Sequence, residues 1–136
     1  MKLSVGIFFI IFLSSCFREQ NEISGTYQSD LRYVDRIKYY NCGFFAGSTL
    51  KLNKDSTFNY KTCSMISSGN WKFLHDTIYL HFSQKRFRID SLKYSKKWKK
   101  YLIISDTAQK FKVKNSSLIC LHKEKFKSYM EILYRK

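Results

Sequence analysis

The chain contains no proline and only five glycines among its 136 residues. That composition excludes collagen-like repeats and proline-rich linkers. Acidic residues are also scarce, since ten Asp and Glu stand against 25 Lys and Arg, and the net charge is +15. Hydrophobic residues make up 44% of the chain and aromatic residues 18%, which excludes intrinsic disorder. The sequence therefore encodes a folded, strongly basic protein, whose charge reflects either an anionic partner or a lysine-rich composition.

The first 16 residues have the organisation of a signal sequence. Lys2 supplies a positive charge, and the uncharged apolar run 5–13 follows it. Its nine residues suit a signal peptide and fall short of the ~20 that a membrane-spanning helix requires. The run ends at Leu13-Ser14-Ser15-Cys16, which resembles the lipobox of bacterial lipoproteins. The resemblance implies cleavage before Cys16 and a lipid on its thiol. An ordinary secretory peptide and an uncleaved N-terminal anchor are the alternatives.

The expected lipid anchor sets the domain organisation and the compartment. Residues 1–15 are the predicted signal peptide, 16–22 the lipidated N-terminus and tether, and 23–136 one folded domain. The 121 residues left after cleavage suffice for one hydrophobic core and are too few for two. Because Phe17 and not Asp follows the cysteine, the resemblance to lipoprotein sorting signals implies the outer membrane of a bacterial envelope. We therefore expect a membrane partner through the lipid and no nucleic acid.

The domain shows period-two alternation of polar and apolar residues, which is typical of half-buried strands. If Leu50 and Leu52 line one core with Tyr60 and Phe58, the two strands pair around a three-residue turn at 54–56. By the same argument Trp71 and Phe73 face Leu80 and Ile78 across a two-residue turn at His75-Asp76. Asn115-Ser116-Ser117 joins the last such pair of strands. Sequential hairpins of this kind predict a meander.

The expected fold is an all-β antiparallel meander that closes into a lipocalin-like barrel of about 8–10 strands, because closure removes exposed sheet edges. A two-sheet sandwich is the alternative, and 126–134 also suits a short helix. The expected strands are 24–29, 36–42, 48–53, 57–63, 69–75, 77–82, 86–92, 99–104, 109–114, 117–123 and 128–134.

Three motifs carry a family resemblance. Gly25-Thr26-Tyr27 looks like the G-x-W start of lipocalin-type barrels, with Tyr in place of Trp. The stretch 48–58, with a Lys/Asp turn followed by Thr57-Phe58, and then Gly69-Asn70-Trp71, are similar to the pattern of small lipocalin-like bacterial lipoproteins. The match covers roughly residues 23–82. It implies the barrel fold and says little about a ligand.

Three cysteines follow Cys16, namely Cys42, Cys63 and Cys120. In an oxidising compartment the expected disulfide joins Cys42 to Cys63, because the predicted register places Cys63 opposite Gly47, just downstream of Cys42. It would close a loop of 22 residues and contribute roughly 3 kcal/mol on the chain-entropy model. Cys120, in an apolar strand, is the expected buried thiol. Full reduction of all three is the alternative.

The histidines and cysteines do not predict a metal site. Cys120-x-His122 puts two possible ligands on one strand face, but a tetrahedral site needs three or four that converge. His75 falls in a predicted turn, His81 has a surface explanation, and no C-x-x-C motif occurs. We therefore expect no metal and no cofactor.

The segment 93–101 contains five lysines around three aromatic residues. Alternation fails in it, which predicts a hairpin loop with irregular strand ends. It could contact anionic phospholipid or lipopolysaccharide, or it could be a solvated turn with Trp98 packed on the barrel rim. The candidate surface residues are Lys96, Lys97, Trp98, Lys99 and Lys100.

No paired carboxylates, Ser–His–Asp arrangement or glycine-rich phosphate loop occurs in the sequence, so we expect a protein that is not an enzyme. Two functions remain. The barrel could bind a small apolar or amphipathic ligand or an envelope component inside a cavity larger than ~300 Å³. Alternatively, a solid barrel could act as an interaction module through its basic 93–101 segment. The candidate pocket residues are Phe58, Tyr60, Trp71 and Phe73.

Overall fold

The computed structural model of the chain describes residues 22–30, 47–89, 94–124 and 127–136. The predicted signal peptide, Cys16, Cys42 and the predicted strand 36–42 lie outside the described residues. Within them, no helix combines the length and the apolar character needed to cross a membrane.

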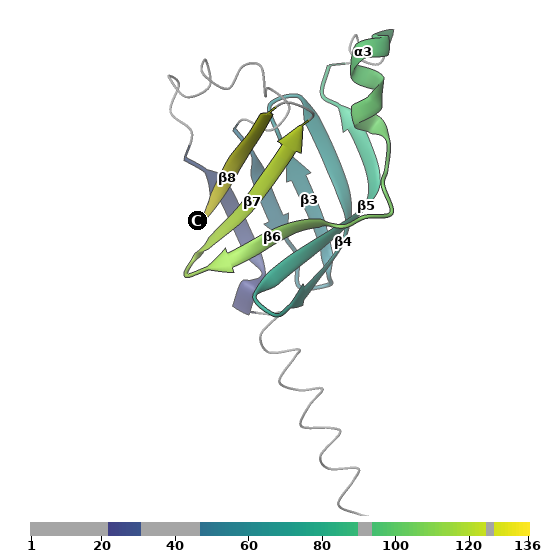
Figure 1. The fold of residues 1–136 in the computed structure, drawn as a ribbon. Helices are drawn as coiled ribbons and strands as arrows, with labels where there is room; N and C mark the ends of the chain where they lie inside the picture. Colours follow the sequence, from purple (N-terminus) through teal and green to yellow (C-terminus); the bar gives the residue numbers. More distant parts are fainter. Residues whose placement is uncertain (1–21, 31–46, 90–93, 125–126) are drawn as a thin grey trace, which may run out of the picture.

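Eight antiparallel strands form one closed barrel in which every strand pairs with its neighbours in the chain and β8 pairs with β1 (Figure 1). The predicted meander barrel is therefore confirmed, and the sandwich alternative is wrong. The strands are β1 (Gly25–Ser29), β2 (Thr49–Leu52), β3 (Thr57–Lys61), β4 (Met65–Leu74), β5 (Thr77–Phe87), β6 (Gln109–Lys114), β7 (Ser117–Glu124) and β8 (Lys127–Arg135).

The first predicted hairpin is confirmed. Leu52 pairs with Phe58 and Leu50 with Tyr60, as the shared apolar face requires. The backbone N–H of Asn53 donates to the carbonyl of Thr57 at 2.9 Å, which leaves a three-residue loop at 54–56. The last residue of this loop has a φ of 66°, the left-handed conformation expected at the end of such loops.

The next two hairpins are also close to prediction. Trp71 pairs with Leu80 and Phe73 with Ile78, around a turn in which His75 and Asp76 have φ values of 47° and 54°. Positive φ at both central residues is the type I′ geometry that matches strand twist. After β6 the turn is shorter than predicted, because Ser117 already belongs to β7 and pairs with Lys114.

Strands β4 and β5 are longer than their apolar patterns indicated. The predicted segments 77–82 and 86–92 merge, up to Phe87, into one strand. A β-bulge between Ser68 and Gly69 shifts the register and hides this continuity from a simple alternation count. A Cβ built on Gly69 would lie 1.9 Å from the carbonyl oxygen of His81, so the bulge requires glycine there.

The predicted strand 99–104 and the predicted hairpin loop at 93–101 are wrong. Residues Lys96–Lys99 form the helical turn α3, and Lys100–Leu102 continue as the 3-10 helix η3. Helical spacing lets Trp98, Tyr101 and Leu102 pack together on a small cluster of buried residues, Met65 and Phe87. The helix alternative for 126–134 is also wrong, because β8 runs through it from Lys127 to Arg135.

The hairpin turns that follow β2, β4 and β6 lie at one end of the barrel, and that end is filled. Trp71 is fully buried there, and its indole N–H donates to the carbonyl of Asn53 at 3.0 Å. Arg135 adds a polar clamp, since its guanidinium donates to the carbonyls of Glu22 and Ser24. The core consists of Tyr27, Leu50, Leu52, Phe58, Tyr60, Trp71, Ile78, Leu80, Phe111, Leu118, Cys120 and Leu133.

Candidate functional site

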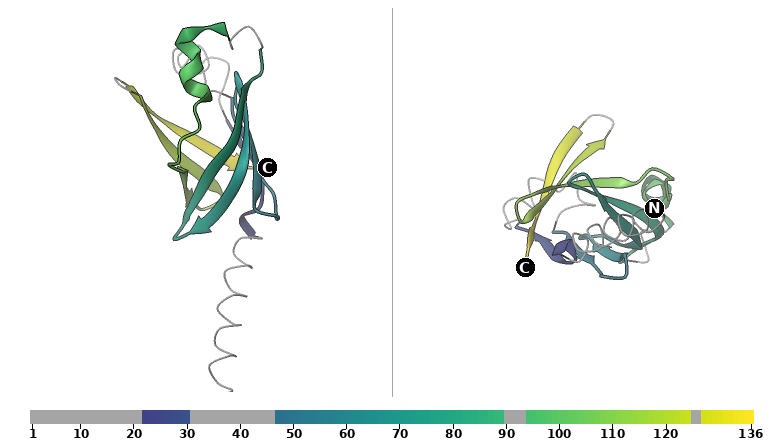
Figure 2. Two further views of the ribbon diagram at one scale, coloured as in Figure 1. Left: turned by 90° about the vertical axis from the view of Figure 1, so that its right-hand side faces the viewer. Right: turned by 90° about the horizontal axis from the view of Figure 1, so that it is seen from below.

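The barrel wall is incomplete at its other end. Strand β6 is short, so beyond Leu80 β5 has no β6 partner, and beyond Ile119 neither does β7. Figure 2 shows β7 and β8 diverging from β4 and β5 toward the end where α3 lies. A pocket of about 860 Å³ occupies this region, well above the ~300 Å³ at which ligand pockets begin.

The pocket has apolar walls and a basic rim. Phe82 on β5, Met65 on β4 and Tyr101 in η3 supply much of the apolar surface. Four lysines, one each from β5, η3, β6 and β7, form the basic rim. The remaining lining residues include Tyr60, Thr62, Ser67, Lys85, Lys100, Ile103, Thr107, Ala108, Gln109, Lys110, Cys120, Leu121, His122 and Lys123.

Lys85 is the cation most deeply placed in the pocket wall. Its ammonium lies 4.7 Å from the centre of the Phe82 ring and donates to the carbonyl of Ile103 at 3.1 Å. Burial lowers the pKa of Lys85 from its usual value. No ion pair within the described ranges involves this ammonium. A partly desolvated cation that has no carboxylate partner in the described part of the chain favours an anionic group brought by a ligand.

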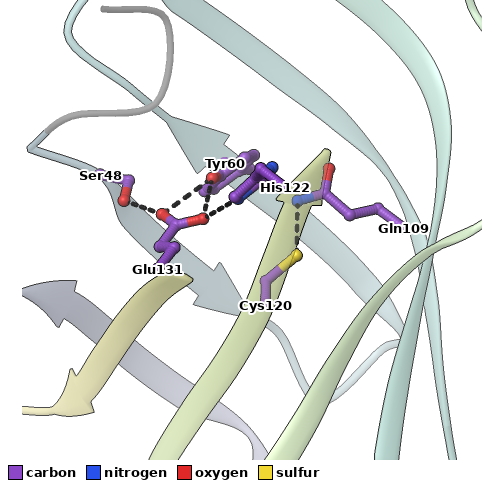
Figure 3. A network of polar contacts seen from close by, with 6 residues as sticks. All are labelled: Ser48, Tyr60, Gln109, Cys120, His122 and Glu131. Atoms are coloured by element: carbon purple, nitrogen blue, oxygen red, sulfur yellow. Dashed lines mark hydrogen bonds and ion pairs between the residues drawn. The ribbon is translucent and has the colours of Figure 1, made fainter. Parts of the chain in front are cut away.

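The innermost polar groups form a network around Glu131 (Figure 3). The carboxylate is only 4% exposed, because β8 points it into the barrel opposite Cys120. The hydroxyl of Tyr60 donates to its two oxygens at 2.9 and 2.8 Å, and the hydroxyl of Ser48 donates to Oε1. Nε2 of His122 lies 2.5 Å from Oε2. Three side chains, from the residue before β2, from β3 and from β7, thus satisfy one buried carboxylate on β8.

Cys120 lies beside this network, and its thiol is poorly reactive. Burial, helped by the nearby Glu131 carboxylate, raises the pKa of its thiol to about 12. The amide of Gln109 donates to Sγ at 3.6 Å and opposes that shift. Because the thiolate is the reactive form, this cysteine is not an activated nucleophile.

The network does not have the order of a hydrolase triad. Ser48 donates to the carboxylate, whereas a nucleophilic serine donates to an imidazole that takes its proton. In the described part of the chain, no three His, Cys, Asp or Glu side chains are grouped so as to hold a metal ion. The arrangement can instead donate and accept hydrogen bonds at the base of an apolar pocket.

Compared with protein-family models, curated proteins and solved structures, the chain matches none of them. The pocket itself is therefore the feature that points to a function. Its apolar walls, its basic rim and its polar base are the properties that a ligand has to complement.

One of the four candidate pocket residues lines the pocket, and the other three lie elsewhere. Tyr60 lines it and belongs to the Glu131 network. Phe58 and Trp71 are fully buried in the packed end of the barrel, and Phe73 packs against the same core. Alternation identified the inward face of these strands but not the level along the barrel at which packing stops.

The candidate basic surface is exposed on the α3–η3 segment. The aromatic ring of Trp98 is half-buried against Met65 and Phe87, and the ammonium of Lys97 lies 4.4 Å from its centre. Trp98 therefore packs on the barrel, as the solvated-turn alternative predicted. The four exposed lysines are Lys96, Lys97, Lys99 and Lys100.

The cysteine predictions are only partly testable. Cys120 is a buried thiol, as expected. Cys63 is exposed, and no disulfide joins two cysteines of the described ranges. Cys42 lies outside those ranges, so its pairing with Cys63 stays a prediction.

Sequence reasoning missed Glu131, Ser48 and Lys85. Of these three residues, Glu131 was the easiest to predict from the sequence. Strict alternation in β8 puts position 131 on the same face as buried Leu133. An acidic residue at an inward position, one strand away from Cys120-x-His122, is a signal for a buried polar network. Lys85 carried no such signal, since the bulge at Ser83 of β5 and the position of η3 decide its surroundings.

Proposed function

We propose that this protein is a lipid-anchored envelope lipoprotein whose barrel binds one small amphipathic ligand. The ligand would combine an apolar body with an anionic group. The observation that carries the proposal is the 860 Å³ pocket, in which an apolar wall meets a half-buried ammonium without a carboxylate partner among the described residues. The lipid anchor rests on Leu13-Ser14-Ser15-Cys16 alone.

The bound arrangement follows from the lining. An apolar chain would cover Met65, Phe82 and Tyr101, where burial of apolar area contributes roughly 25 cal/mol per Å². The anionic group would lie against Lys85, with Lys100 near the rim. The Glu131 network would face the ligand from the base of the pocket, where a second polar group could reach Tyr60 or His122.

The test compares three C12 amphiphiles that differ only in the head group, namely dodecanoate, dodecan-1-ol and dodecylamine. Isothermal calorimetry on the full chain should show saturable binding, tightest for dodecanoate. Lys85→Met should weaken dodecanoate binding about 30-fold and leave the alcohol unchanged, because one partly buried charge contact contributes about 2 kcal/mol. Lys51→Met, on the outer face of β2, is the matched control.

Absence of saturable binding for all three compounds would overturn the proposal. Native mass spectrometry of protein purified from its own envelope adds an independent readout. A retained mass of a few hundred daltons supports the ligand, and a bare mass after mild extraction contradicts it.

A second candidate function is an interaction module that acts through the basic α3–η3 segment. It is favoured by the four exposed lysines, which surround a helical turn whose aromatic side packs on the barrel. Neutralising Lys96, Lys97 and Lys99, none of which lines the pocket, would then abolish binding to anionic vesicles without changing dodecanoate binding.

A further inference from the structure

The outer face of β7 and β8 is apolar. Leu121, Met130 and Tyr134 are 54%, 60% and 50% exposed, and Leu121 pairs directly with Met130. Ile119 and Ile132 form the next cross-strand pair and are half-buried. We call these five outward side chains the apolar stripe. A contiguous exposed apolar surface on a folded protein marks a contact site.

The outer faces of four other strands differ from it. Outward positions on β1, β2, β3 and β6 carry only polar or basic side chains. They are Thr26, Gln28, Thr49, Lys51, Thr57, Asn59, Lys61, Lys110, Lys112 and Lys114. The outward positions of β4 and β5 include single apolar residues, namely Ile66, Leu74 and Tyr79, each of which pairs with a polar or basic residue. Among the described strands, only β7 and β8 pair apolar outward side chains with each other, so the stripe is not a general feature of the composition.

A basic strand flanks the stripe. All three outward lysines of β6 are exposed, and Lys112 pairs across the ladder with Ile119. No ion pair recorded within the described ranges includes Lys110, Lys112 or Lys114. The surface of β6, β7 and β8 is therefore amphipathic, with unneutralised positive charge at the edge of an apolar stripe.

We propose that this surface docks on an anionic lipid membrane. Apolar side chains would enter the interface between head groups and acyl chains, and the β6 lysines would contact lipid phosphates, each worth about fivefold in affinity near an anionic surface. A second copy of the chain is the other possible occupant. A two-fold contact through the stripe would bring two β6 strands of like charge together in a protein of net charge +15, which disfavours it.

Leu121 and Lys110 also line the pocket, whereas Met130, Lys112 and Lys114 line neither the pocket nor α3. These three residues therefore test the docking surface separately from the proposed ligand binding. The test is hydroxyl-radical footprinting of the full chain, read by mass spectrometry at single residues. The probes are vesicles of phosphatidylcholine, with and without phosphatidylglycerol. Met130 reports on the stripe, Tyr94 on the approach to α3, and Leu74, 53% exposed at the β4–β5 turn, serves as the control.

We expect the oxidation of Met130 to fall about threefold or more on anionic vesicles and to stay unchanged on neutral ones, because the charge term selects the lipid. Leu74 should react equally in all samples. Unchanged oxidation of Met130 on anionic vesicles would overturn the proposal, as would protection of Tyr94 alone. Protection of Met130 that rises with protein concentration without vesicles would assign the stripe to a second copy.

Charge variants give a second readout. Lys112→Glu with Lys114→Glu should weaken binding to anionic vesicles about tenfold or more, since two favourable contacts become repulsive. Lys51→Glu with Lys61→Glu, on the outer faces of β2 and β3, makes the same change in charge on a face that the proposal leaves in water and should change binding far less. Equal effects of the two double reversals would reduce the attraction to net charge and overturn the proposed face.

Discussion

At the scale of single residues, Glu131 occupies a position that is unfavourable for a charged side chain, because it is buried inside the barrel. It is a buried carboxylate whose cost is offset by hydrogen bonds from Ser48, Tyr60 and His122. These donors come from segments far apart in the sequence. The network therefore links the β7–β8 hairpin to the opposite wall of the barrel.

Removing that acceptor should be costly. We expect Glu131→Leu to lower the free energy of unfolding by about 3 kcal/mol or more, because several buried donors lose their shared partner. Glu131→Gln keeps the size and one acceptor oxygen and should cost about half as much. Urea unfolding measures both, with exposed Asp106→Asn as the control. A Glu131→Leu variant as stable as that control would show that the network does not stabilise the fold.

Cys120 predicts a pH dependence in the alkaline range. Because its pKa is raised by burial from 9.0 to about 12, the folded state favours the protonated thiol. That contribution is complete below pH 9 and is lost progressively as the pH rises toward 12. The unfolding free energy of the native chain should therefore fall more steeply over this range than that of Cys120→Ala, by up to ~1.4 kcal/mol per pH unit. Parallel curves would contradict the burial of the thiol.

Gly69 should tolerate no side chain. We expect Gly69→Ala to destabilise the protein by about 2 kcal/mol or more, because the added methyl group would meet the backbone of His81 and force β4 and β5 apart. Ser68→Ala, the neighbouring position in the same bulge, is the control and should cost less than about 1 kcal/mol. Thermal unfolding followed by circular dichroism compares the two.

At the scale of elements, the hairpin turns restrict the identity of their residues more than the strands do. His75 and Asp76 adopt left-handed conformations that neither side chain favours as strongly as Asn-Gly does. We expect His75→Asn with Asp76→Gly to raise the unfolding free energy by about 1 kcal/mol, because the type I′ turn is retained and its strain is relieved. The same double change would destabilise the protein if the turn were of another type. Urea midpoints measured at constant slope decide between these outcomes.

The α3–η3 segment shows why an element can escape a pattern search. It is only seven residues long, too short to form a stable helix alone. Its aromatic residues form a face only when they rest on Met65 and Phe87. Polar/apolar alternation fails in the segment because its apolar face is determined by the contact with Met65 and Phe87 and not by a place in a sheet.

At the scale of the whole molecule, the barrel has a packed end and an open end. The packed end contains the fully buried Trp71, Leu80 and Phe111, whereas the open end contains the pocket. Such an asymmetry should appear in the local stability of the strands. It also separates the residues that hold the fold from those available to a ligand.

Hydrogen exchange should resolve these two ends. We expect the amides of β3 and of 77–80 to exchange most slowly, and those of 121–124 to exchange at least about tenfold faster, because they lack a β6 partner. Exchange followed by NMR on the full chain measures both groups. Addition of a bound amphiphile should slow the second group selectively. Uniform protection along β7 would contradict the open wall.

The sequence by itself determined the fold class, two hairpin registers and the inward face of most strands. Pairs such as Leu50 with Tyr60 and Trp71 with Leu80 follow from alternation and turn length, both of which are local properties. It also supplied the lipobox resemblance, which no tertiary contact can replace. The buried state of Cys120 was predictable for the same local reason.

Only the tertiary structure decided where the barrel is hollow. The shortness of β6, the bulge at Gly69 and the docking of Trp98 leave one part of the inward face unpacked, and each depends on contacts between distant segments. The same contacts bring Glu131 to His122 and Tyr60, and leave Lys85 beside an aromatic ring without a carboxylate partner in the described part of the chain. Alternation tells inside from outside, because it is a property of one strand. Whether the inside is filled depends on how all eight strands meet.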